Sequence, residues 1–177
     1  NMMTNSEAPV LWIASPVYDG CVSDYVNSVL QLCSTAAQAG IKVQLRHVTG
    51  QSLVTSGRNH IAANFLASPD STHLMMLDAD MGCDGDAAIK MLRANVDVIV
   101  AAYLSRDGRF LATGRVRESD KPGLFSCETA GAGCMMISRR ALLRMIEAYP
   151  QLKLNGQVGQ GTEPYNYMFF QAEQVDG

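Results

Sequence analysis

The chain has 177 residues, of which 47% are hydrophobic and 18% charged, with a formal net charge of −3 and a pI near 5.5. This length and apolar content suit one sizeable core, so we expect a single domain over residues 1–177. Because Lys and Arg form no basic stripe, nucleic acid is not an expected partner.

The cysteines and the N-terminus bear on the cellular compartment. None of the five cysteines forms a C-x-x-C pair, which argues against a zinc site and favours reduced thiols. The first residues carry no basic stretch followed by an apolar one, and no segment approaches the roughly 18 apolar residues of a membrane span. We therefore predict a cytoplasmic protein with no membrane span.

The first half of the chain alternates short apolar runs with helical spacing. The run Val10–Ala14, closed by Ser15-Pro16, is typical of a strand buried on both faces. Further strands are predicted over 41–48 and 73–77, the latter ending at Asp78. A helix is predicted over 23–39, and a second helix is expected to be capped by Ser56.

The second half continues this alternation. Asp84 or Asp86 is expected to cap a helix that runs through Ala94, and Val96–Tyr103 is predicted to be a strongly apolar strand. The polar segment Arg106–Lys121 favours a loop or an edge ribbon. A strand over 134–137 and a helix over 138–149 follow.

This pattern predicts an α/β fold with a mostly parallel sheet and helices on both faces. In such sheets, ligands bind beyond the carboxyl ends of the strands. Residues that follow the predicted strands are therefore the first place to look for chemistry.

Two carboxylates, Asp78 and Asp80, follow the strand predicted over 73–77. In an extended chain alternate residues point the same way, so both could address one site. Carboxylate oxygens suit Mg²⁺ or Mn²⁺, which commonly share protein carboxylates with substrate phosphates. The sequence predicts a metal site here. A solvated turn with capping aspartates is the simpler alternative.

Arg58 and Asn59 are expected in the first turn of the helix capped by Ser56, where free N–H groups and an Arg fork would suit a phosphate. A capped surface helix is the alternative. Pro16, Val17, Tyr18 and Asp19 follow the first strand, where a nucleotide base could stack on the tyrosine. An ordinary strand-to-helix loop is the alternative there.

Gly131, Ala132 and Gly133 open the strand predicted over 134–137. Glycine there permits close approach of a ligand to the backbone, or only a tight bend.

In order and spacing, these motifs resemble the GT-A family of glycosyltransferases over about residues 10 to 145. The resemblance implies a Rossmann-like nucleotide-diphospho-sugar transferase fold, a Mn²⁺ or Mg²⁺ cofactor, and transfer of a sugar from a UDP- or GDP-sugar, with UDP favoured, to an unknown acceptor. It implies that Asp78 and Asp80 are catalytic and hold the metal. The remaining roles it implies are nucleotide binding by Pro16, Val17, Tyr18, Asp19, Arg58, Asn59 and Asp78, and donor-sugar contacts by Gly131, Ala132 and Gly133.

The sequence departs from that family in one respect, because many members carry a downstream acidic pair and a late metal-binding His. Here Glu163, Glu173 and Asp176 are the only late acids. A chain cut before the last elements of the fold, a mechanism without that base, or a non-catalytic nucleotide-sugar-binding module would each explain this. A sugar-phosphate nucleotidyltransferase is a further alternative, but it needs a Gly-rich basic loop after the first strand.

Overall fold

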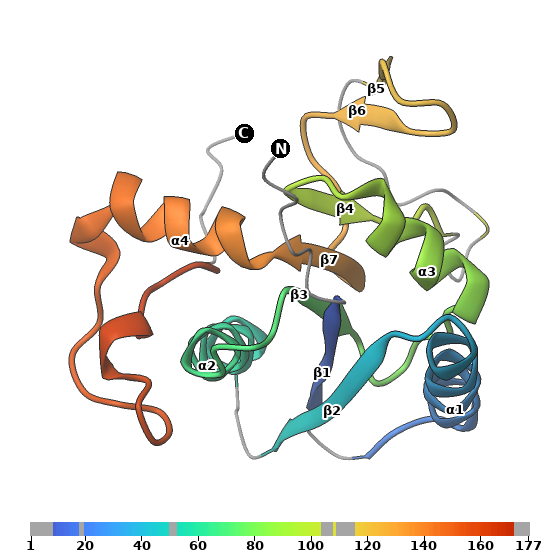
Figure 1. Cartoon of the computed structure of the whole chain (residues 1–177). Helices are drawn as coiled ribbons and strands as arrows, with labels where there is room; N and C mark the ends of the chain where they lie inside the picture. Colours follow the sequence, from blue (N-terminus) through green and yellow to red (C-terminus); the bar gives the residue numbers. More distant parts are fainter. Residues whose placement is uncertain (1–8, 18–19, 50–52, 104–107, 109–115, 172–177) are drawn as a thin grey trace, which may run out of the picture.

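The computed structural model describes residues 9–17, 20–49, 53–103, 108 and 116–171 (Figure 1). A five-stranded sheet has the order β2-β1-β3-β7-β4, and a separate two-stranded ribbon pairs β5 with β6. The strands are β1 (Val10–Val17), β2 (Lys42–Thr49), β3 (His73–Leu77), β4 (Val98–Val100), β5 (Val116–Glu118), β6 (Phe125–Cys127) and β7 (Cys134–Ser138). The helices are α1 (Ser23–Gln38), α2 (Val54–Ala67), α3 (Gly85–Ala94) and α4 (Arg139–Ala148), with short 3₁₀ turns η1 (Pro150–Leu152) and η2 (Glu163–Tyr165).

The sheet is mostly parallel, as predicted. β1 pairs in parallel with both β2 and β3, whereas β7 is antiparallel to both of its neighbours, β3 and β4. One reversed strand therefore lies between strands that run in the same direction. For this reason the segment that enters β7 lies at the same edge as the segment that leaves β3.

Side chains of β1 alternate between two cores, one on each face of the sheet. Leu11 and Ile13 are buried with residues of α1 and α3, whereas Trp12 and Ala14 are buried with residues of α2 and α4. Figure 1 shows α1 and α3 on one side of the strands and α2 on the other. A continuous apolar run was expected to be covered on both faces, and the prediction of helices on both faces is confirmed.

Three predicted boundaries are wrong. Ser15-Pro16 was expected to close the first strand, but β1 continues through both residues to Val17 because Pro16 and Val17 still pair with β2. α2 begins at Val54 after Leu53, which makes no side-chain cap, so Ser56 lies inside the helix. The strand predicted over Val96–Tyr103 is only three residues long. β4 is an edge strand that pairs with β7 alone, and β7 is itself short, so only Val98–Val100 have strand partners.

Other boundaries agree with the sequence. β3 spans the predicted residues, Asp84 caps α3 by accepting from the Ala87 N–H at 2.9 Å, and Ser138 caps α4. Within the segment predicted as a loop or ribbon, the described residues 116–118 form β5 of the ribbon. Among the described residues, no helix combines the length and the apolar character needed to cross a membrane.

Candidate functional site at the carboxyl edge of the sheet

The segments after β3 and before β7 meet at one edge of the sheet. The backbone N–H of Asp78 donates to the carbonyl of Gly133 at 2.8 Å. Because β7 is reversed, this bond brings the predicted carboxylate motif and the predicted donor-sugar segment together. The two motifs are 55 positions apart in the sequence.

Arg58 joins the same site from α2. Its Nη2 donates to both carboxylate oxygens of Asp78, at 2.8 and 3.1 Å, and lies 3.5 Å from the carbonyl of Ala132. The Arg58 and Asp78 side chains are only 14% and 30% exposed. The guanidinium therefore supplies the cation that the Asp78 carboxylate needs when it is partly removed from water. The buried Nε of Arg58 has no hydrogen-bond partner within the described part of the chain.

Asp78 and Asp80 do not lie in an extended segment. The alternation of an extended chain therefore cannot make their side chains point the same way, and that prediction is wrong. Residues 78–81 form a turn closed by a hydrogen bond from the Met81 N–H to the Asp78 carbonyl at 3.0 Å. Asp78 is half-buried against Arg58, whereas Asp80 is exposed at the corner of the turn. The two carboxylates thus have different surroundings.

The residues at this turn fit a divalent cation in part. Magnesium is commonly held by one or two carboxylates and completed by substrate phosphates and water, and an exposed Asp80 suits that arrangement. The Asp78 carboxylate is already engaged by Arg58. Across the described residues, no group of three or more His, Cys, Asp and Glu side chains is placed to hold a metal ion. Any cation here would depend on the ligand for most of its coordination.

Asn59 has a different environment from the one predicted. Because α2 begins at Val54, Arg58 and Asn59 lie beyond its first turn. Asn59 is buried, accepts from the Phe170 N–H at 2.8 Å and donates to the Phe170 carbonyl at 3.0 Å. These two bonds hold the segment that follows η2 against the helix, so both polar groups of Asn59 are already used.

The structure gives Gly133 a packing role. A Cβ atom at this position would collide with the Met81 Sδ and with the Tyr103 hydroxyl. The Gly133 N–H also donates to the Tyr103 hydroxyl at 3.3 Å. A side chain at this position would require Met81 and Tyr103 to move. Gly131 and Ala132 are half-buried, Gly131 beside the cavity described below and Ala132 beside Arg58.

The end of β1 lies near the same turn. Pro16 and Val17 pair with Val48 and Thr49 of β2, and Tyr18 and Asp19 lie outside the described residues. The Val22 N–H, just before α1, donates to the Ala79 carbonyl at 3.0 Å. This bond ties the start of α1 to the turn that bears Asp78 and Asp80.

A hydrogen-bonded chain that runs from buried Ser15 and Tyr25 to exposed His47 was missed from the sequence. The Ser15 hydroxyl lies 2.5 Å from the Tyr25 hydroxyl, which in turn lies 3.0 Å from Nε2 of His47. Burial raises the pKa of Tyr25, partly offset by the Ser15 hydrogen bond. The signal available in the sequence was a serine at the end of an apolar strand, which must find a partner when buried.

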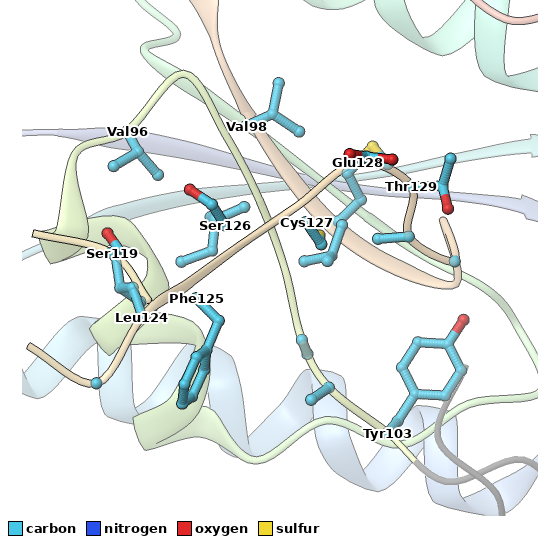
Figure 2. A pocket seen from close by; sticks show the side chains of 18 residues that line it. Val96, Val98, Tyr103, Ser119, Leu124, Phe125, Ser126, Cys127, Glu128 and Thr129 are labelled. Atoms are coloured by element: carbon cyan, nitrogen blue, oxygen red, sulfur yellow. The ribbon is translucent and has the colours of Figure 1, made fainter. Parts of the chain in front are cut away.

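A cavity of about 660 Å³ lies between β4 and the β5–β6 ribbon (Figure 2). Its walls are mainly apolar or backbone, with Val98, Leu124 and Phe125 among the side chains, and it extends to Tyr103 and Gly131. The residues that line it do not include Asp78 or Asp80. It adjoins the carboxyl-edge site through Gly131 and through Tyr103, whose hydroxyl accepts from the Gly133 N–H. Its size is in the range of small-molecule sites.

Comparisons with known proteins leave the family open. No protein-family description matches the chain, and no curated protein matches it. Among solved structures, A197 from STIV is 18% identical with a TM-score of 0.49, covering 77% of this chain and 67% of that one. The 4-diphosphocytidyl-2C-methyl-D-erythritolsynthase from Anaerococcus prevotii DSM 20548 is 9% identical with a TM-score of 0.41, covering 84% of this chain and 80% of that one. We assign neither a family nor an activity from similarities of this size.

Proposed function

We propose that the chain binds a nucleoside-diphosphate sugar at the carboxyl edge of its sheet and transfers the sugar to an acceptor with the help of Mn²⁺ or Mg²⁺. The observation that carries the proposal is the convergence of Asp78, Arg58 and the Gly131–Gly133 segment at one edge. The hydrogen bonds from the Asp78 N–H to Gly133 and from Arg58 to both Asp78 and Ala132 support it. This is the edge at which open α/β sheets bind their ligands.

In this proposal the turn holds the charged half of the donor. Asp80, exposed at the corner of the turn, would be the protein ligand to the cation, which would otherwise depend on the phosphates and on water. The cation would neutralise charge that develops on the diphosphate leaving group. Arg58 keeps Asp78 oriented and lies close enough to the turn to contact a phosphate.

The cavity between β4 and the ribbon is the proposed place for the acceptor. It adjoins Gly131, which in this proposal lies beside the donor sugar, and it has room for a small molecule. Its mainly apolar walls favour an acceptor with an apolar portion. The position of the cavity supports sugar transfer over nucleotide binding alone, because a module that only binds needs no second site.

The first experiment is a thermal-shift panel of UDP, GDP, CMP and ATP, each with and without Mn²⁺. We expect one nucleotide to stabilise the chain in a Mn²⁺-dependent way, by about 2–3 kcal/mol at a hundredfold excess over Kd. Absence of a metal-dependent shift with every nucleotide would contradict the proposed site. Binding without release of nucleotide from the matching donor sugar, tested with apolar and sugar acceptors, would leave a binding module and refute transfer.

The second experiment compares Asp80→Asn with Asp70→Asn, because both aspartates are exposed in turns at opposite ends of β3. Asp80→Asn should weaken nucleotide binding in Mn²⁺ on the order of tenfold or more, since the cation loses its protein ligand. Asp70→Asn should bind like the parent chain. Isothermal titration calorimetry measures both, and urea unfolding checks that each variant is folded. Equal binding by the two variants would rule out Asp80 as the metal ligand.

A further inference from the structure

Two cysteines meet directly beside the carboxyl-edge site. Cys134 is the first residue of β7 and follows Gly133, and Cys83 lies between the Asp78–Met81 turn and α3. Their Sγ atoms are 3.7 Å apart. All five cysteines are free thiols, and this pair combines close contact with a difference in access: Cys134 is buried, whereas Cys83 is only partly buried.

The two thiols differ in how readily they ionise. The hydrogen bond from the Cys134 thiol lowers the pKa of Cys83, although burial opposes this effect. The same contact and burial raise the pKa of Cys134. Because the thiolate is the reactive form, Cys83 is the thiol that attacks first, and Cys134 is placed to react second.

The backbone at Cys83 is less constrained than the backbone at Cys134. A disulfide requires the two sulfurs to approach to about 2.0 Å, which rotation of both side chains and a small shift of one backbone can provide. Cys134 is fixed in the sheet between β3 and β4. Cys83 is in a segment without regular structure, where its N–H is held by the Ser28 hydroxyl at 2.9 Å.

We propose that Cys83 and Cys134 form a reversible intramolecular disulfide by exchange with a small-molecule disulfide such as glutathione disulfide. The Cys83 thiolate attacks one sulfur of the small disulfide, forms a mixed disulfide and releases one small thiol. Cys134 then loses its proton and attacks the Cys83 sulfur, which releases the second small thiol. The two protein thiols are oxidised, and one small disulfide is reduced to two thiols.

The new bond would join the segment after the Asp78–Met81 turn to the start of β7. Both segments belong to the carboxyl-edge site, because Asp78 and Gly133 are hydrogen-bonded to each other. We therefore infer that oxidation alters nucleotide binding there. This second step rests on the proposed function, whereas the disulfide itself does not.

The test uses the full chain with Cys127→Ser, because the tryptic peptide that ends at Arg139 otherwise contains both Cys127 and Cys134. Cys127 is exposed in the ribbon, so this substitution should not disturb the core. The tryptic peptide that ends at Lys90 contains only Cys83. After incubation with glutathione disulfide and alkylation of remaining thiols, we expect these two peptides to be linked and to separate on reduction.

Single substitutions test the order of the steps. With Cys134→Ser added, Cys83 should accumulate as the glutathione mixed disulfide, because nothing resolves it. With Cys83→Ser added, Cys134 should remain unmodified, since it is buried. Exposed Cys21 serves as the internal control for reagent activity. Modification of Cys21 without any linked Cys83–Cys134 peptide would overturn the proposal, as would a stable mixed disulfide at Cys83 while Cys134 is present.

The effect on the site is measured separately with the nucleotide identified by the thermal-shift panel. Oxidised and reduced chain should differ at least threefold in Kd, and reduction should restore the parent value. Equal affinities would refute the inferred effect on binding while leaving the disulfide intact. If no nucleotide binds, the proposed function fails, and the linked peptides still decide whether the disulfide forms.

Discussion

Two aspartates at opposite ends of the strands each form salt bridges with arginine, in very different surroundings. At the carboxyl edge, Asp78 is paired with Arg58 and both are largely enclosed. Near the other end of β4 and β7, Asp97 accepts from Arg140, from Arg144 at 3.0 Å and from Ser138 at 3.3 Å. There the Asp97 and Arg144 side chains are 40% and 72% exposed.

The comparison contrasts a largely enclosed ion pair with two exposed ones. Exposed pairs contribute little because water and salt screen them, and Asp97 would keep one arginine if the other were removed. A partly enclosed carboxylate has less access to water. If its arginine is removed, the negative charge is therefore poorly solvated. Arg58 therefore matters for the folded geometry of the turn.

The largest expected effect follows from Arg58→Ala. Removing the guanidinium leaves Asp78 without this partner, and we expect a loss of about 1–3 kcal/mol in the free energy of unfolding. Urea denaturation measures it. The matched control is Arg144→Ala, which should leave the urea midpoint unchanged. Restoration of stability in the double variant Arg58→Ala/Asp78→Ala would identify the uncompensated carboxylate as the cause, and no restoration would exclude it.

A smaller effect is expected from pH at Asp97. The hydrogen bond from Arg140 holds the pKa of Asp97 below its usual value, with Arg144 and Ser138 adding to this effect. The stability it contributes is therefore present above the ordinary aspartate pKa of about 3.9 and is lost as pH falls through the lower folded-state value. Asp97→Asn should show a shallower decline of the urea midpoint between neutral and acid pH. An unchanged decline would mean that the arginines do not stabilise the charged form.

The smallest effect is expected from salt. At about 1 M NaCl the Debye length is about 3 Å, so the exposed pairs of Asp97 should be largely screened. The difference in urea midpoint between the parent chain and Asp97→Asn should then shrink. The difference caused by Arg58→Ala should persist, because the enclosed pair is screened less. If salt reduced both shifts in urea midpoint equally, the Arg58–Asp78 pair would be screened as much as the exposed pairs of Asp97, contrary to this prediction.

The sequence predicted the layers and much of the element order. The end of β3 was predicted because its apolar run stops at the charged Asp78. The starts of α3 and α4 were predicted because Asp84 and Ser138 are residue types that cap helices. The start of α2 was missed because its first residues, Leu53 and Val54, are apolar, exposed and without a capping side chain. Such a start depends on how the helix packs, which local pattern does not report.

For the candidate site, the structure brings together segments that the sequence singled out, but the hydrogen-bond partners of their side chains were not predicted. Asp78, Arg58 and Gly133 meet as expected of one site, yet the pairing of Arg58 with Asp78 depends on how α2 lies across the sheet. From the sequence, Asn59 could not be distinguished from a ligand-binding residue. The structure shows that both polar groups of its side chain bond to the backbone of Phe170. The proximity of Cys83 and Cys134 likewise required the register of β7.

The reversed direction of β7 has a consequence for redesign. In a sheet whose strands all run one way, only the connections that leave the strands reach the ligand edge. Here the connection that enters β7 reaches it too, while Ser138 and the start of α4 emerge at the far edge. If the proposed site binds a ligand, changes in loop length between the ribbon and Gly131 should therefore alter its specificity, whereas changes at Ser138 and the start of α4 should affect it less.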